Sequence, residues 1–372
     1  MSIEAVVELS REFGGNPEWV LAGGGNTSYK NDDFLWVKAS GYALATIGPD
    51  GFAKMDRARL AACAEATYPD DEAKREAGAL ADLMAARVDG EEKRPSVETL
   101  MHHLIPFPLI VHTHPALVNG ITCGLEGEAA ATRIFGDDVL WIRAIEPGYI
   151  LSLEIKRRIA AHKEARGSAP RVILMQNHGL VVAGDSAEEI RELHRSIADR
   201  VKQALVREPD LSDVPVNDAL RDEWHRTIAD QFPEAEIEFD VNRELAHRLA
   251  SSESFAPLTG PFSPDHIVYA RVAPLLVASD ASVKAFADAI EEHRAAHGAD
   301  PKIIAVLGLG VFAVAGTLKA TDSALRLFTD AARVAAYAES FGGARHLDPH
   351  LVAFIEGWEV EQFRKKLSTG GS

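Results

Sequence analysis

Two runs of the sequence share one pattern, and this pattern constrains the fold more than any other feature. The first run is Arg171-Val-Ile-Leu-Met-Gln-Asn-His-Gly-Leu-Val-Val-Ala-Gly, and the second is Lys302-Ile-Ile-Ala-Val-Leu-Gly-Leu-Gly-Val-Phe-Ala-Val-Ala. Each reads as an apolar strand, a turn with glycine and a second apolar strand, and a long helical stretch follows each. Buried strands that alternate with helices are typical of an α/β fold. The runs either descend from a duplication or look alike because such units are common, and the sequence leaves both explanations open.

The length of 372 residues favours two domains. We predict a first domain over residues 1–207, a polar and partly helical interdomain region over 208–260, and a smaller C-terminal α/β unit over 261–372, which could be a degenerate repeat. Helices are expected over residues 1–20, 56–68, 72–87, 187–206, 217–231 and 241–250.

The charge balance disfavours nucleic acid as a partner. The chain carries 39 basic and 56 acidic residues, a net charge of −17, and has no stripe of Lys and Arg with interleaved aromatic residues. A membrane span is not expected either, because no run of about 18 apolar residues occurs. We see no signal peptide, and Cys63 and Cys123 are expected to be buried free thiols, so a cytoplasmic location is predicted.

Three histidines lie at expected strand ends. His112 and His114 follow the apolar strand 109–111, and alternate residues of a strand point to the same side, about 7 Å apart. Such a pair alone is more often two exposed histidines, or one core histidine with a surface neighbour, than a metal site. His178, in the turn of the first repeated run, adds a third imidazole, and three such ligands are typical of a catalytic zinc site. Leu309 stands in the place of His178 in the second run, so the metal is expected in the first half only.

Glu98 lies near the start of a predicted helix for which Ser96 is the expected N-cap. Glu98 could interact only with the helix N-terminus, or it could move a proton beside the metal, and its position leaves both roles open. His102 and His103 on the same helix are interpreted as a packing residue and a surface residue, not as ligands.

A glycine loop over residues 23–28 has neither the dinucleotide nor the Walker pattern, so no nucleotide site is predicted. Its glycines would let backbone N–H groups approach an anion, although a simple turn explains them equally well. Additional polar or charged groups for such an anion could come from Asn26, Thr27, Ser28, Ser40 and Lys38.

In their order and spacing, these motifs resemble the class II aldolase and adducin-head family. The residues that carry the resemblance are Gly25-Asn26-Thr27-Ser28, Ser40-Gly41, Pro95-Ser96-Val97-Glu98, His112-Thr113-His114-Pro115 and Asn177-His178-Gly179-Leu180, over about 25–205. The chain is also similar to the aldolase part of bifunctional rhamnulose-1-phosphate aldolase/alcohol dehydrogenase proteins. That similarity extends, less specifically, to the second unit around Pro264-Asp265-His266, and no dinucleotide fingerprint accompanies it.

The resemblance implies a three-layer α/β/α fold around a mainly antiparallel sheet. It implies a zinc ion, or another divalent metal such as Mn2+ or Co2+, held by His112, His114 and His178, with Glu98 as the acid/base. It also implies a small-molecule sugar or sugar-phosphate substrate and a homo-oligomer, often a tetramer. The residues expected to bind the substrate or its phosphate are Gly25, Asn26, Thr27, Ser40, Gly41 and Ser96.

The expected activity is that of a metal-dependent aldolase, which cleaves a ketose or ketose 1-phosphate by retro-aldol chemistry through a metal-stabilised enediolate. The family also contains sugar-phosphate epimerases, dehydratases and decarboxylases. A non-catalytic module like the adducin heads is less well supported, because the ligands and Glu98 are all present. Val97 stands where such aldolases carry a second phosphate-binding serine. Arg143 stands near the place of their tyrosine acid, with Tyr149 displaced, so phosphate recognition and the general acid stay open.

Overall fold

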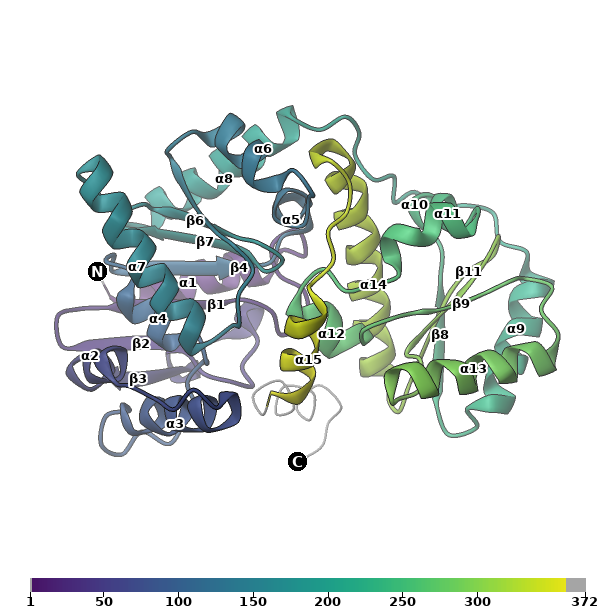
Figure 1. Ribbon diagram of the computed structural model, residues 1–372, viewed down its shortest axis with the longest axis horizontal. Coiled ribbons are helices and arrows are strands. Elements are labelled where there is room, and N and C mark those ends of the chain that lie inside the picture. Colours follow the sequence, from purple (N-terminus) through teal and green to yellow (C-terminus); the bar gives the residue numbers. More distant parts are fainter. Residues whose placement is uncertain (1, 359–372) are drawn as a thin grey trace. The chain divides into compact units, whose positions relative to one another are not determined.

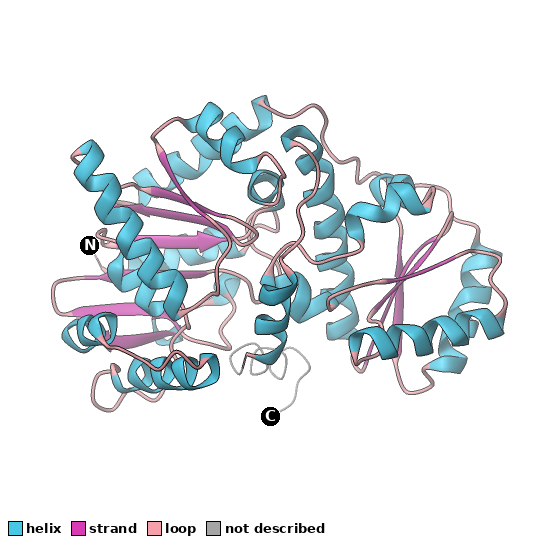
Figure 2. Cartoon of the chain, viewed as in Figure 1, coloured by secondary structure: helices cyan, strands magenta, loops and turns pink. Residues whose placement is uncertain are grey.

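The computed structural model describes residues 2–358, which form two compact units (Figures 1 and 2). Unit 1 comprises residues up to 118 together with 128–204, and unit 2 comprises 119–127 together with the described residues from 205 onward. The stretch 208–260, expected between two domains, lies in unit 2. It does so because it supplies strand β8 (Glu236–Asp240), which pairs with a strand of the second repeated run.

Unit 1 is built on a seven-stranded sheet with the order β3-β2-β1-β4-β7-β6-β5. Its strands are β1 (Asn26–Lys30), β2 (Phe34–Lys38), β3 (Phe52–Asp56), β4 (Leu109–Thr113), β5 (Val139–Ile142), β6 (Val172–Met175) and β7 (Gly179–Gly184). Only β5 and β6 pair in parallel, and the other neighbouring pairs are antiparallel. The sheet is thus mixed but mainly antiparallel, as the resemblance implied.

Helices cover both faces of this sheet, which confirms the three-layer prediction. The helical segments of unit 1 are α1 (Ile3–Gly14), η1 (Leu44–Thr46), η2 (Pro49–Gly51), α2 (Arg57–Glu65), α3 (Glu72–Ala85), α4 (Thr99–Leu104), α6 (Gly127–Phe135), α7 (Tyr149–Arg166) and α8 (Ala187–Gln203), and α5 (Ala116–Thr122) begins in unit 1 and ends in unit 2. α4 and α7 pack on one face, where their apolar residues share a core with β4, β6 and β7. α1 and α8 pack on the other face, against β1, β4 and β7. Alternating side chains along each strand therefore enter two separate cores.

Helix α4 begins at Thr99, so the prediction that Ser96 is its N-cap is wrong. Glu98 occupies the N-cap position, and the Ser96 hydroxyl oxygen instead accepts a hydrogen bond from the backbone N–H of Glu98 at 3.2 Å. The cause lies just upstream, where Pro95 forms an isolated β-bridge with Ala39 and keeps the chain extended up to this point. The later start places Glu98 at the positive end of the helix.

Unit 2 contains a four-stranded sheet with the order β8-β11-β10-β9. Its further elements are α9 (Asp218–Gln231), α10 (Arg243–Arg248), α11 (Ser252–Phe255), η3 (Ala256–Leu258), α12 (Pro264–Ala270), β9 (Leu275–Val277), α13 (Val283–His297), β10 (Ile303–Val306), β11 (Gly310–Ala315), α14 (Leu318–Ala338), η4 (Glu339–Phe341) and α15 (Pro349–Gly357). Apolar residues of α9, α13 and the sheet form its core.

The two repeated runs adopt the same backbone arrangement. β6 and β7 form an antiparallel hairpin with β5 parallel on one side and β4 antiparallel on the other, and β10 and β11 have β9 and β8 in the same places. The turns end at His178 and at Leu309, and in both hairpins the residue just before this one has a positive φ, 53° at Asn177 and 72° at Gly308. The backbone N–H of the next residue donates to the carbonyl oxygen three positions earlier, from His178 to Met175 and from Leu309 to Val306, each at 3.1 Å.

Among residues 2–358, the structure has no helix that is both long and apolar enough to cross a membrane.

Candidate metal centre

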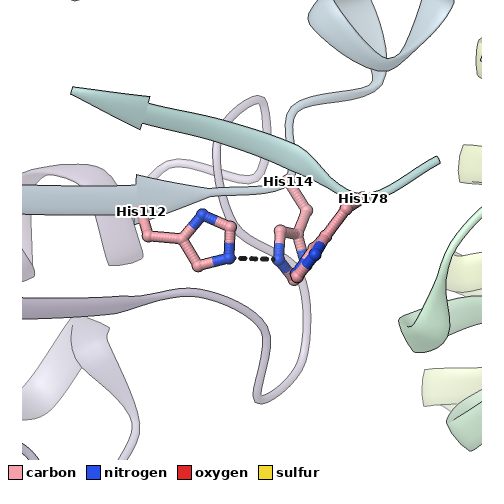
Figure 3. A group of neighbouring side chains, drawn as sticks. All are labelled: His112, His114 and His178. Atoms are coloured by element: carbon pink, nitrogen blue, oxygen red, sulfur yellow. Dashed lines mark hydrogen bonds between the residues drawn. The ribbon is translucent and has the colours of Figure 1, made fainter. Parts of the chain in front are cut away.

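Three histidine side chains of unit 1 converge beside β4 and the β6–β7 hairpin (Figure 3). His112 belongs to β4, His114 follows its last residue, and His178 lies in the hairpin turn. Each ring offers a nitrogen, these nitrogens lie within 4.8 Å of one another, and the Nε2 atoms of His112 and His114 are 2.9 Å apart. The pairing of β4 with β7 brings together residues that are more than sixty positions apart in the sequence. The three rings could hold a metal ion.

Gly179 makes this convergence possible. A Cβ atom at residue 179 would lie 2.5 Å from the carbonyl oxygen of Thr113 and 2.7 Å from the Cδ2 atom of His114. Any side chain would therefore displace the β4 backbone or the imidazole of His114. The glycine after His178 is thus required by the close approach of the hairpin to β4.

The ring of His112 is held in one tautomer. Its Nδ1 lies 2.9 Å from the carbonyl oxygen of Leu180, and a carbonyl only accepts hydrogen bonds, so Nδ1 carries the proton. Complete burial lowers the pKa of His112 to about 3, against the opposing charge of Glu98, and the ring is neutral near pH 7. The Nε2 lone pair then faces His114 and Glu98, as a metal ligand requires. A backbone partner of this kind fixes ligand orientation in metal sites.

Glu98 completes the centre from the start of α4. Its carboxylate is 7% exposed and lies 3.2 Å from Nε2 of His178 and 3.5 Å from Nε2 of His112. Burial alone would raise the pKa of Glu98, but the neighbouring imidazoles and a hydrogen bond from Asn26 hold it well below its ordinary value. The carboxylate is thus ionised and adjacent to ring nitrogens of His112 and His178, so it could exchange a proton with a molecule bound there.

Of the residues expected to bind substrate, those of the glycine loop lie within the protein. Gly25 has a φ of 69°, and the Asn26 side chain donates to Glu98. The structure corrects the prediction that the Thr27 side chain binds substrate. This side chain is fully buried on the other face of β1, where its hydroxyl lies 2.6 Å from that of Ser10. Alternation along the strand separates it from Asn26. The side chain of Thr27 therefore has a structural role.

Ser40, Gly41 and Ser96 form a second group, at the segment that leads to Glu98. The backbone N–H of Ser40 donates to the carbonyl of Arg94 at 2.8 Å, and that of Ser96 donates to the carbonyl of Lys38 at 3.3 Å. These bonds align the end of β2 with the segment that leads to Glu98. Gly41 is exposed, with a φ of 91°, and both serines are partly exposed. This group can contact a molecule in solution, unlike the side chain of Thr27.

The contacts of Tyr149 and Arg143 argue against a role for either residue in proton transfer at the three histidines. The Tyr149 hydroxyl donates to the carbonyl of Ala66 at 2.8 Å, and its ring packs edge-on against Tyr68. Burial raises the pKa of the Tyr149 hydroxyl. Arg143 pairs with Glu128 at 3.0 Å. Tyr149 is therefore a packing residue.

Sequence reasoning missed the surroundings of His102. The ring is fully buried, as expected for a packing residue, but its Nδ1 and Nε2 are hydrogen-bonded to Ser28 and Asn26. One signal was available in the sequence. His102 follows Glu98 by four residues, and residues with this spacing share one side of a helix.

Comparisons with known proteins identify the family of the chain. Residues 4–205, more than half of the chain, match the family model described as Class II Aldolase and Adducin N-terminal domain. Uncharacterized oxidoreductase YuxG of Bacillus subtilis (strain 168) is 28% identical over 310 residues, which are 74% of this chain and 42% of that protein. The chain therefore spans less than half the length of this relative.

Solved structures of class II aldolases also match part of the chain. The N-terminal class II aldolase domain of a conserved protein from Thermoplasma acidophilum is 30% identical, with a TM-score of 0.46 over 55% of this chain and 93% of that one. The l-fuculose-1-phosphate aldolase from Thermus thermophilus is 14% identical, with a TM-score of 0.35 over 54% of this chain and 92% of that one. The family match itself covers all three histidines and Glu98.

Proposed function

Because the chain belongs to the class II aldolase and adducin family, we propose that it is a metal-dependent lyase that cleaves a ketose or a ketose 1-phosphate by a retro-aldol reaction. One observation carries this proposal. The Glu98 carboxylate lies within 3.5 Å of ring nitrogens of both His112 and His178, so an acid/base group and a set of metal ligands share one buried point. A module that only binds other proteins has no need of this arrangement.

His112, His114 and His178 would hold the ion, and we propose zinc because three imidazoles with an open position suit it, although Mn2+ or Co2+ would also fit. When bound, the ion would act as a Lewis acid that stabilises the negative charge developing on the carbonyl oxygen of the substrate. Its neighbours in this chain are arranged for that purpose, since the His112 tautomer leaves Nε2 unprotonated.

Glu98 would move the proton. In retro-aldol cleavage a hydroxyl loses its proton, the adjacent carbon–carbon bond breaks to release an aldehyde, and the electron pair remains on the carbon next to the ketone carbonyl. The ionised Glu98 carboxylate would accept the hydroxyl proton and then deliver it to this carbon, and in the reverse direction it would remove the proton from the carbon and return it to the aldehyde oxygen. The Asn26 amide orients this carboxylate from one side. We propose that the substrate's anionic end lies at Ser40, Gly41 and Ser96, with backbone groups near Gly25.

We also propose that unit 2 is a degenerate copy without a metal. In unit 1, His112 pairs with Val181, and the equivalent pair in unit 2 joins Phe239 to Phe312. Leu309 takes the place of His178 in the hairpin turn. Phenyl and aliphatic groups offer no ligand, so we expect about one ion per chain. We further expect a homo-oligomer, as in many members of the family.

Metal content tests the site directly. Purified protein should contain about one zinc equivalent by elemental analysis, and His112→Ala, His114→Ala or His178→Ala should each lower that content at least tenfold. His162→Ala, at a half-buried histidine of α7, is the matched control and should retain the ion. Full metal content in all three ligand variants would refute the site.

Turnover tests the reaction. The metal-loaded enzyme should release aldehyde from at least one member of a panel of ketoses, offered with and without a 1-phosphate. Glu98→Gln should keep the metal and lose at least about 10²-fold in kcat. If the panel gives no aldehyde but the products show inversion at a carbon, loss of water or loss of CO2, the retro-aldol proposal is wrong and another activity of the family applies.

A further inference from the structure

Alternate residues of β1 lie along α4 and hold it by polar contacts. Asn26, Ser28 and Lys30 point to the same face of the sheet, and each bonds to α4 or to the residues that flank it. Two residues of a strand advance by about 6.6 Å, and four residues of a helix advance by about 6 Å. Successive side chains of this strand face therefore meet successive turns of the helix. Lys30 binds the carbonyls at the C-terminal end, among them those of His102 and Ile105.

The middle of this contact is a chain of hydrogen bonds with a fixed direction. A carboxylate only accepts, so the Asn26 Nδ2 group faces Glu98 and the Asn26 Oδ1 atom faces His102. Oδ1 also only accepts, so Nε2 of His102 carries the proton. Burial lowers the pKa of His102 to about 3, and the neutral ring has no second proton. Its Nδ1 must accept from the Ser28 hydroxyl, at 2.7 Å.

Every residue in this series of hydrogen bonds is buried, so water does not substitute for a missing partner. Ser28 and His102 have no exposed surface, and Asn26 and Glu98 are 6% and 7% exposed. An amide group can rotate by half a turn and exchange its oxygen and nitrogen. If Asn26 did so, its oxygen would face the carboxylate and repel it. A group that fixes the amide orientation therefore fixes the position of Glu98.

We propose that His102 is a positioning residue that locks the Asn26 amide with its N–H group toward Glu98. This role rests on the proposed function, in which Glu98 moves the proton. His102 itself does not touch the three ligands, and acts through Asn26. The two hydrogen bonds of His102 go beyond packing, since a residue that only fills space would need no particular ring tautomer.

Two variants and one spectroscopic measurement test this role. His102→Leu keeps the volume and removes both hydrogen bonds. His102→Gln keeps an N–H group close to the place of Nε2. We expect His102→Leu to lower kcat by about 10–100-fold, with KM changed less than about threefold and the metal content unchanged. We expect His102→Gln to recover kcat to within about tenfold of the wild type. Equal losses of kcat in both variants would overturn the proposal.

Nitrogen NMR of protein labelled with 15N-histidine decides the orientation without any turnover. The His102 signals are those that disappear in His102→Gln. The proposal requires a protonated Nε2 and an unprotonated Nδ1 in the wild-type protein across the neutral pH range. The opposite tautomer would turn the Asn26 amide around and overturn the proposal, whatever the substrate is. A correct tautomer in a protein that cleaves no ketose would leave the orientation in place and refute only the aldolase function.

Discussion

Gly25 allows the glycine loop to pass close to a metal ligand, and Gly25→Ala tests this contact. The backbone of Gly25 has a φ of 69°, and a Cβ there would lie 2.6 Å from the carbonyl oxygen of His112. The left-handed conformation costs an alanine about 1 kcal/mol. The contact falls on backbone in a central strand, where relief by movement costs about 2 kcal/mol more. The total expected loss of stability is about 3 kcal/mol.

Gly136→Ala separates the cost of the left-handed backbone conformation from the cost of the contact with His112. Gly136 has a similar φ of 59°, lies in unit 1, and has nothing within 4 Å of the position that a Cβ would take. Thermal unfolding followed by circular dichroism should show a fall in Tm of roughly 2–4 °C for Gly136→Ala, and roughly 6–12 °C for Gly25→Ala. Gly25→Ala should also weaken metal binding, because the displaced carbonyl belongs to His112. Equal falls in Tm for the two variants would refute the argument that proximity to His112 demands the glycine.

Two further predictions concern a buried histidine, His194, and a buried lysine, Lys30. Burial lowers the pKa of His194 to about 4, so the unfolded state takes up this proton first and stability is lost as the pH falls from about 6.5 to about 4, by about 3 kcal/mol in all. His194→Phe should flatten this part of the curve of unfolding free energy against pH, and an unchanged curve would contradict the assignment. Lys30→Met should remove the amino group that donates to the carbonyls of His102 and Ile105 and cost about 2–4 kcal/mol in urea unfolding. A loss below about 1 kcal/mol would show that the carbonyls find other partners.

The parts of the site that could be predicted from the sequence depend on short-range patterns. Strand alternation over His112 and His114 and the apolar strand before His178 place each imidazole at an element end, whatever the rest of the chain does. The ordering of these motifs then identified the family. The convergence of the three rings follows from the pairing of β4 with β7, which the pattern of each strand alone does not specify.

The relation between Asn26 and His102 could not be predicted in this way. These residues are 76 positions apart, and their contact depends on how far α4 is displaced along β1. Sequence reasoning also placed the start of α4 too early, with Ser96 and not Glu98 as its N-cap. The spacing of residues within a helix does not depend on where the helix begins, so the sequence relates His102 to Glu98 but does not relate either residue to Asn26.

Composition misled the interpretation of β8. The stretch around Glu236–Asp240 is acidic and was taken for part of an interdomain region, yet Ile237 and Phe239 alternate with its charged residues. This is the pattern of a strand with one face in the core. β8 lies at the edge of its sheet, where charged side chains reduce unwanted strand pairing. The acidity of the stretch reflects this edge position and not a linker.

The hairpins of the two units explain why a fold can keep its backbone pattern without its ligands. Gly179 and Gly310 each lie where a Cβ would collide, the first with His114 and the β4 backbone and the second with the ring of Phe239 at 2.4 Å. A close approach by the neighbouring strand or its ring thus favours glycine in both hairpins, whether that ring is an imidazole or a phenyl group. No packing requirement favours imidazole over phenyl at residue 239, where the ring contacts Phe312. The histidines at positions 112, 114 and 178 could hold a metal ion, whereas residue 239 offers no ligand, and this difference is the basis for proposing the metal in unit 1.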